Sequence, residues 1–268
     1  MVDLIKVLTL FFALIMFSGC TSLKSLVLRG NEGESKENEF YKTNPVDFSE
    51  QLESLGKDYI NTPEVIQLKI SQKSKNYLNK MYEILVQNNE LILNKKIGPK
   101  FHIIKERTPF FFSLPKGNFF FSLGLFQKYL KNEGLLLSIL ASETLKSHQN
   151  LYIRREVIPI GYINIEKILS LTRLPFSVKS EINKWAYNLI KRTGLDAHVY
   201  LLWLQTLNKN SIDFSLQIGN IMEISREEFD FKSYLVKEET KYVPQEEIGL
   251  NSSPDFYNLI NEMKRIKL

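Results

Sequence analysis

The sequence predicts an α+β fold, mainly helical, with a small β-sheet beside the helices. Apolar residues recur at helical spacing in residues 66–91 and again from Leu125 onward. Between these regions lie three short apolar runs, rich in phenylalanine, with the length and turn-residue borders of strands. No internal repeat and no second domain boundary interrupts residues 45–268, so we expect one domain there.

Composition and charge narrow the classes of function. Apolar residues make up 44% of the sequence, which is enough for a buried core. The net charge of +5 is spread along the chain, with Lys and Glu interleaved. The sequence has no dense basic stripe, no nucleic-acid-binding motif and no glycine-rich phosphate loop, so we expect no nucleic-acid partner. The weak basic excess suits an anionic membrane surface and an ordinary solvated surface equally well.

The N-terminus has the features of an export signal. Lys6 precedes an apolar run, Val7 to Phe17, that is shorter than the about 20 residues of a membrane-spanning helix. Ser18-Gly19-Cys20 ends this run, and the segment resembles the lipobox of bacterial lipoproteins. The resemblance implies that residues 1–19 are a signal peptide and that Cys20, the only cysteine, is lipidated and anchors the chain. An ordinary signal peptide or a short buried helix is the alternative.

The resemblance also implies a location in the cell envelope. The protein would be fixed to the outer membrane or to the periplasmic face of the inner membrane. Residues 20–44 are polar and mixed in charge, and Gly30 to Ser35 has nothing to bury, so we expect a flexible tether there. A chain with a single cysteine has no internal disulfide, so the domain depends on its own core for stability.

The elements of the domain follow in order. Residues 66–91 predict a helix, and the turn Pro115-Lys116-Gly117 joins the second and third strands. The expected strands are residues 101–104, 110–114 and 118–123. The expected later helices are Leu135 to His148, Ile163 to Leu171, a helix capped by Ser177 that runs to Thr193, Leu195 to Leu207, and a last one after Ser253-Pro254. Residues 211–250 carry no clear pattern.

Three segments, in this order and spacing, resemble the M48-type zinc metallopeptidases. Thr108 to Gly117 is similar to the family's Asn-Ala-Phe-Ala-Leu-Pro-Gly-Gly element, and Asn118 to Leu123 to the strand after it. Gly124-Leu125-Phe126 is similar to the Gly-Leu-Leu that follows, and Leu137 to Lys146 to the helix that carries His-Glu-x-x-His. The resemblance covers roughly residues 65–205. It implies a metallopeptidase-like domain with a small sheet beside the former active-site helix.

The metal ligands of that family are missing here. A catalytic zinc needs three protein ligands and an open position for water. Ser142 stands at the first His position, Glu143 at the Glu position and Lys146 at the second His position. Glu181 is the best match to the third ligand, but Lys184-Trp185 replaces the expected Ala-Asp. A hydroxyl is a poor zinc ligand and a protonated ammonium is none, so we expect no metal, no cofactor and no metal-dependent hydrolysis.

A residual polar face on this helix leads to a hypothesis. Ser142, Glu143 and Lys146 lie within about 100° of one another on a helical wheel. The Lys146 ammonium would occupy the place of the zinc and pair with Glu143 and Glu181, because a buried carboxylate without a cation is costly. The alternative is an ordinary surface pair of Glu143 and Lys146 with little energy.

Other catalytic constellations are weakly represented. His102, His148 and His198 are the only histidines, and their surroundings share no metal-ligand spacing; His148 is expected at a helix end. No Gly-x-Ser-x-Gly pattern of a nucleophile elbow occurs.

The sequence therefore predicts a non-catalytic, membrane-anchored lipoprotein with a metallopeptidase-like domain. We expect it to bind polypeptides in envelope protein assembly or quality control, by strand addition to an edge strand formed by Asn118, Phe119, Phe120, Phe121 and Ser122. One alternative is an active hydrolase with an atypical site, which predicts a cleft with convergent polar groups and a perturbed titratable residue. The other is a surface lipoprotein that binds a host or neighbour protein, which predicts a filled site and an exposed apolar patch elsewhere.

Overall fold

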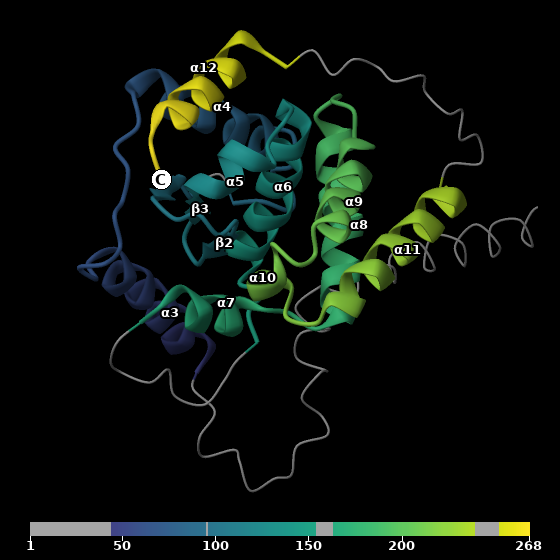
Figure 1. Cartoon of the computed structure of the whole chain (residues 1–268). Coiled ribbons are helices and arrows are strands. Elements are labelled where there is room, and N and C mark those ends of the chain that lie inside the picture. The colour runs from purple at the N-terminus through teal and green to yellow at the C-terminus, as the bar shows by residue number, and fades with distance from the viewer. Residues whose placement is uncertain (1–43, 95, 154–162, 239–251) are drawn as a thin grey trace, which may run out of the picture.

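The computed structural model describes residues 44–94, 96–153, 163–238 and 252–268 (Figure 1). The expected signal peptide 1–19, the anchor residue Cys20 and the tether up to residue 43 lie outside the described residues. Helices dominate and a single three-stranded sheet accompanies them, which confirms the predicted α+β class. Within the described ranges, no helix combines the length and the apolarity needed to cross a bilayer.

The three described strands follow one another along the chain, with helices before and after them, as the sequence predicts. The strands are β1 (Lys100–Ile104), β2 (Phe111–Leu114) and β3 (Asn118–Ser122). The helices are α3 (Pro45–Ile60), α4 (Gln72–Gln87), α5 (Leu123–Lys128), α6 (Glu133–Gln149), α7 (Ile165–Thr172), α8 (Phe176–Arg192), α9 (Val199–Lys209), α10 (Ser215–Ile218), α11 (Ile221–Glu238) and α12 (Pro254–Arg265).

The sheet has the order β1-β3-β2, with β3 parallel to β1 and antiparallel to β2. Phe120 lies opposite His102 on one side and Phe112 on the other. The prediction of an edge strand at residues Asn118–Ser122 is therefore wrong: β3 is the central strand, and Phe119 and Phe121 are fully buried. The reason is topological. After β1 the chain first forms β2 at the opposite edge of the sheet, and the hairpin that follows places β3 between β2 and β1.

Helices cover both faces of this sheet, and the side chains of β3 alternate between them (Figure 1). Phe119 and Phe121 belong to the larger core, together with side chains of α4, α6, α8, α9, α11 and α12. Phe120 points the other way, into a smaller core with α3 and α7. Both faces of the strand are therefore dry, which explains why three consecutive phenylalanines are buried.

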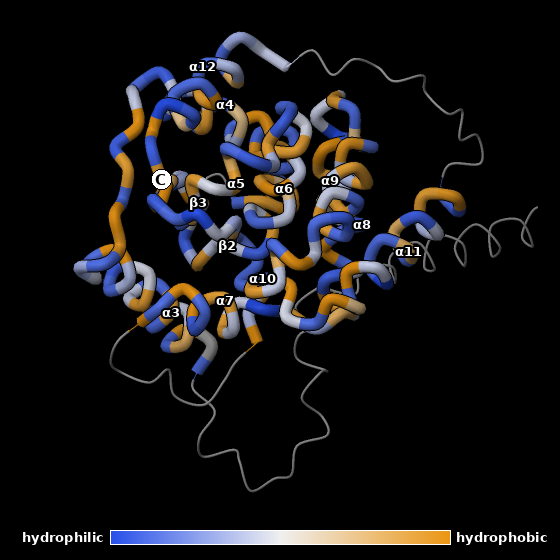
Figure 2. Tube along the Cα trace, in the orientation of Figure 1, coloured by the Kyte–Doolittle hydropathy of each residue, from blue (hydrophilic) through white to orange (hydrophobic). Residues whose placement is uncertain are grey.

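The helix α6 lies at the centre of the larger core, packed against β2, α8 and α9. Apolar stretches of α6 and α9 lie close together in the middle of the molecule (Figure 2). The side chain of Asn132 caps the N-terminus of α6 by accepting from the N–H of Leu135, at 3.0 Å. Asn150 ends the helix in the left-handed conformation, with φ 52°. All residues from Leu135 to Ser147 are buried, as the sequence predicts for this helix.

Several predicted helix boundaries are wrong. The N-cap of α8 is Pro175, and Ser177 lies within the first turn instead of capping it. The helix predicted from Leu195 begins at Val199, because residues 194–198 form a turn in which the N–H of His198 bonds to the Asp196 carboxylate. The region 211–250, for which no element is predicted, contains α10 and the 18-residue helix α11.

Candidate functional site

The candidate site is centred on the polar residues of α6. Glu143 and Lys146 project from this otherwise apolar helix, and their side chains are only 4% and 11% exposed. The Lys146 Nζ atom lies 3.0 Å from Glu143 Oε1 and 2.9 Å from Oε2. The surface-pair alternative is therefore wrong: the two charges form a buried ion pair, as the replacement hypothesis requires.

The Glu143 carboxylate has further donors in the neighbouring strand. Its Oε2 atom accepts from the backbone N–H of Ser113, at 2.7 Å, and from the Ser113 hydroxyl, at 2.8 Å. Together with Lys146, these donors supply hydrogen bonds to both carboxylate oxygens. A general base of a metallopeptidase must instead be free to take a proton from a metal-bound water.

Ser142 does not act as a partner in this arrangement. Its hydroxyl donates to carbonyl oxygens of its own helix, 3.1 Å from that of Ile139. Its described contacts include no carboxylate, imidazole or amine, so the geometry does not make Ser142 an activated nucleophile.

Glu181 lies away from the pair. Its Oε1 atom is 2.9 Å from the Nζ atom of Lys184, one turn along the same helix, and both side chains are partly exposed. The part of the hypothesis that pairs Glu181 with Lys146 is therefore wrong. The physical reason is the phase of α8, which turns Lys179 and Asn183 toward α6 and turns Glu181 toward solvent.

Lys179 and Asn183 contribute to a second ion pair, with the buried Glu227, which the sequence does not predict; the Lys179 side chain is 18% exposed. Lys179 Nζ lies 3.1 Å from Glu227 Oε1, and the Asn183 amide lies 3.4 Å from Glu227 Oε2. The hydroxyl of Tyr200 in turn donates to Asn183, at 2.8 Å. Burial raises the pKa of the Glu227 carboxyl above its usual range, although Lys179 opposes the shift. The sequence carries no clear signal for this pair, because α8 has many other polar residues besides Lys179 and Asn183.

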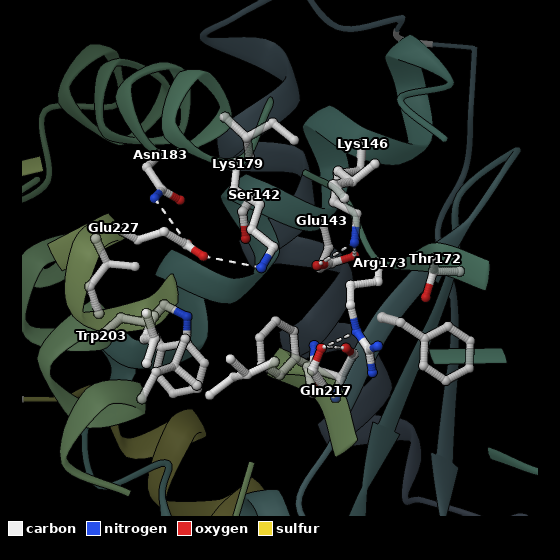
Figure 3. A pocket seen from close by; sticks show the side chains of 18 of the residues that line it. Ser142, Glu143, Lys146, Thr172, Arg173, Lys179, Asn183, Trp203, Gln217 and Glu227 are labelled. Atoms are coloured by element: carbon white, nitrogen blue, oxygen red, sulfur yellow. Dashed lines mark hydrogen bonds and ion pairs between the residues drawn. The ribbon is translucent and has the colours of Figure 1, made fainter. Parts of the chain in front are cut away.

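Both ion pairs line one cavity of about 110 Å³ (Figure 3). Residues of β2 and of the helices α6 to α11 line this cavity, and many of their side chains are apolar. Besides the residues of the two pairs, the lining includes Phe111, Trp203, Leu204, Leu207 and Ile218. The cavity lies between α6 and β2, on the side of α6 that carries Ser142, Glu143 and Lys146.

The outer edge of β2, beside this cavity, is closed by side chains. The Gln217 amide accepts from the N–H of Phe111, at 2.9 Å, and donates to its carbonyl oxygen, as a paired strand would. The next backbone groups on this edge belong to Ser113. Its N–H donates to the Glu143 carboxylate, and its carbonyl oxygen accepts from the hydroxyl of Tyr152. Arg173 fixes Gln217 in place by donating to the carbonyl of Leu216, at 2.6 Å. Strand addition at this edge would require displacement of these groups.

The three histidines lie apart and have separate surroundings. His102 contacts Gln67 and stacks on Phe120. His148, near the end of α6 as predicted, bonds to Tyr82. His198 precedes α9 and lies beside the ring of Tyr187. Among the described residues, no group of three or more His, Cys, Asp or Glu side chains is arranged to hold a metal ion.

Comparisons with known proteins add no family to this geometry. No family model matches the chain, and no curated protein shows significant similarity to it. The resemblance to the M48-type peptidases therefore rests on the sequence segments alone.

Proposed function

We propose that this chain is a lipid-anchored protein of the bacterial envelope whose domain is a non-hydrolytic, metallopeptidase-like scaffold. The observation that carries the proposal is the state of Glu143. Its position matches the catalytic Glu of the resemblance, yet both of its oxygens are occupied by Lys146 and Ser113. A divalent metal at this place would have to displace an ammonium that already neutralises the carboxylate.

A scaffold without hydrolysis acts by binding, and we propose a polypeptide segment as its ligand. The cavity combines apolar walls with two charge pairs, a surface suited to an apolar side chain with polar neighbours. Because Gln217 and Glu143 occupy the backbone groups of β2, such a segment would enter by a side chain and not as an added strand. Anchoring through Cys20 would keep this binding activity at the membrane.

The test uses a fluorescein-labelled, chemically unfolded polypeptide, incubated with the protein in the presence of zinc. The proposal expects binding, measured by fluorescence anisotropy, and an intact polypeptide after long incubation. Leu207→Trp fills the cavity and should weaken binding at least about fivefold. Leu202→Trp adds the same ring to the exposed side of the same helix and is the matched control. Absence of binding, or equal effects of both variants, would overturn the binding role.

A second candidate is a hydrolase with an atypical site, and the raised pKa of Glu227 in a cavity with convergent polar groups favours it. This candidate makes Glu227 a general base. It requires cleavage or hydrolysis of a substrate that stops in the Glu227→Gln variant. Hydrolysis that instead stops in Glu143→Gln would contradict the non-hydrolytic scaffold directly.

A further inference from the structure

The outer face of α11 carries a stripe of exposed apolar side chains. Met222, Phe229 and Val236 are 76%, 72% and 71% exposed. They are seven residues apart, close to two helical turns, so they lie in one line along the helix. The helix lies at the periphery of the molecule, with its other side against α8 and α9 (Figure 1).

Four of the five acidic residues of α11 are turned toward the body of the domain, and the fifth, Glu238, is exposed at the last position of the helix. Glu223 and Glu227 contact Lys179, at 3.2 and 3.1 Å. Glu228 bonds to Asn208, at 2.7 Å, and Asp230 bonds to the Ser180 hydroxyl. These four carboxylates are buried or only partly exposed.

The basic residues border the apolar stripe instead. On a helical wheel Arg226 and Lys237 lie on one side of it and Lys232 on the other, each within roughly 80° of its centre. All three are exposed. Lys232 is already paired with Glu228, at 2.5 Å, and the Arg226 guanidinium lies over the ring of Phe176, at 4.1 Å from its centre. Arg226 and Lys237 therefore carry the positive charge without an acidic partner among the described contacts. The face of α11 that carries the stripe is therefore apolar and basic, because four of the acids are turned inward or to the side and the exposed Glu238 lies on the opposite side of the helical wheel. Figure 2 shows how apolar and hydrophilic residues alternate along this helix.

We propose that this face of α11 binds the surface of an anionic lipid bilayer. The arrangement suits a helix lying in the plane of the interface: apolar side chains enter the acyl region while Lys and Arg stems extend to the phosphate groups. An acidic protein partner would match the basic residues. The charges of α11, however, specify no feature of such a partner that would cover the continuous apolar line. The net charge of +5 adds long-range attraction to the same surface. This inference depends on neither Cys20 nor the cavity.

The experiment adds the full chain to vesicles, with Cys20→Ser so that the native thiol is neither labelled nor lipidated, and with an environment-sensitive fluorophore on a cysteine introduced by Phe229→Cys. A cysteine introduced by Leu91→Cys is the matched control, because Leu91 is 99% exposed and lies outside α11. In vesicles of phosphatidylglycerol and phosphatidylcholine in equal amounts, the label at position 229 should shift to the blue and be quenched by brominated acyl chains. In pure phosphatidylcholine both effects should be much smaller, and the label at position 91 should show neither.

A charge reversal then distinguishes binding to anionic lipid from nonspecific hydrophobic adsorption. Arg226→Glu with Lys237→Glu should reduce the quenching at position 229 and weaken the docking of the face at least about tenfold. Lys75→Glu with Lys100→Glu makes the same change of net charge on exposed residues away from α11 and should have little effect. Equal responses of the two labels, equal quenching in neutral vesicles, or equal effects of the two charge reversals would overturn the proposal. Thermal unfolding of each variant establishes that it is folded.

Discussion

Replacement of Lys146 by methionine should destabilise the domain far more than loss of an ordinary salt bridge. The substitution keeps most of the apolar stem but removes the cation from a Glu143 carboxylate that is only 4% exposed. Removal of one partner from a buried pair costs about 3–5 kcal/mol. The two donors of Ser113 remain and continue to stabilise the carboxylate, so we expect a loss near the lower value, about 3 kcal/mol.

The chain offers a matched control for this experiment. Lys184 and Glu181 have the same spacing along a helix and the same distance of 2.9 Å, but their side chains are 27% and 34% exposed. Because solvent screens such a pair, Lys184→Met should cost less than about 1 kcal/mol. Urea unfolding of residues 44–268, followed by circular dichroism, measures both variants.

A compensating substitution sharpens the test. Adding Glu143→Gln to Lys146→Met removes the uncompensated charge and leaves an amide oxygen that still accepts from Ser113. The double variant should therefore be more stable than Lys146→Met alone, by about 1 kcal/mol or more. A cost for Lys146→Met similar to that for Lys184→Met, or a double variant less stable than the single one, would refute the reasoning.

Three other predictions concern stability. His148 accepts from the N–H of Asn94, at 3.0 Å, and burial lowers its pKa from the usual 6.5 to about 4; the unfolded chain therefore binds the proton more readily. Stability should fall as the pH drops from about 6.5 to 4, by roughly 2 kcal/mol after allowance for partial exposure, and His148→Phe should flatten this part of the urea-derived pH profile. Gln217→Leu leaves the backbone groups of Phe111 without partners and should cost about 1–3 kcal/mol in urea unfolding; no change would show that water replaces the amide freely. Gly124→Ala places a Cβ atom 2.0 Å from the Arg107 carbonyl oxygen and should lower the thermal midpoint despite alanine's better helix propensity, whereas an unchanged midpoint would contradict the close packing.

The sequence predicted what depends on local patterning. The aromatic runs predicted three strands because turn residues border them, and the nearly continuous apolar character of Leu135 to His148 predicted a buried helix. The sequence left the pair of Glu143 and Lys146 open between a buried pair and a surface pair, and the cost of an isolated charge in such a helix favours the buried one that the structure has. These inferences needed no knowledge of distant contacts.

The errors arose where long-range pairing or helix phase decides the outcome. Periodicity does not give the order of strands, so the central position of β3 was missed. On α8 the cavity-facing polar residues are Lys179 and Asn183, whose polar character predicts an exposed position, whereas Glu181, the expected match to a metal ligand, is partly exposed and pairs with Lys184. Helix α11 was missed because its exposed face is itself apolar in places, with Met222 and Phe229 obscuring the simple division into buried and solvated sides.

The zinc content of residues 44–268 tests the central claim most directly. The protein is purified without chelators, saturated with zinc, freed of excess metal and measured by mass spectrometry of the metal. Because Lys146 and Ser113 occupy the Glu143 carboxylate, we expect far less than one zinc ion per chain. Ser142→His with Lys146→His restores two imidazoles one turn apart and should raise the content. One zinc ion per wild-type chain, lost in Glu143→Gln, would contradict the account.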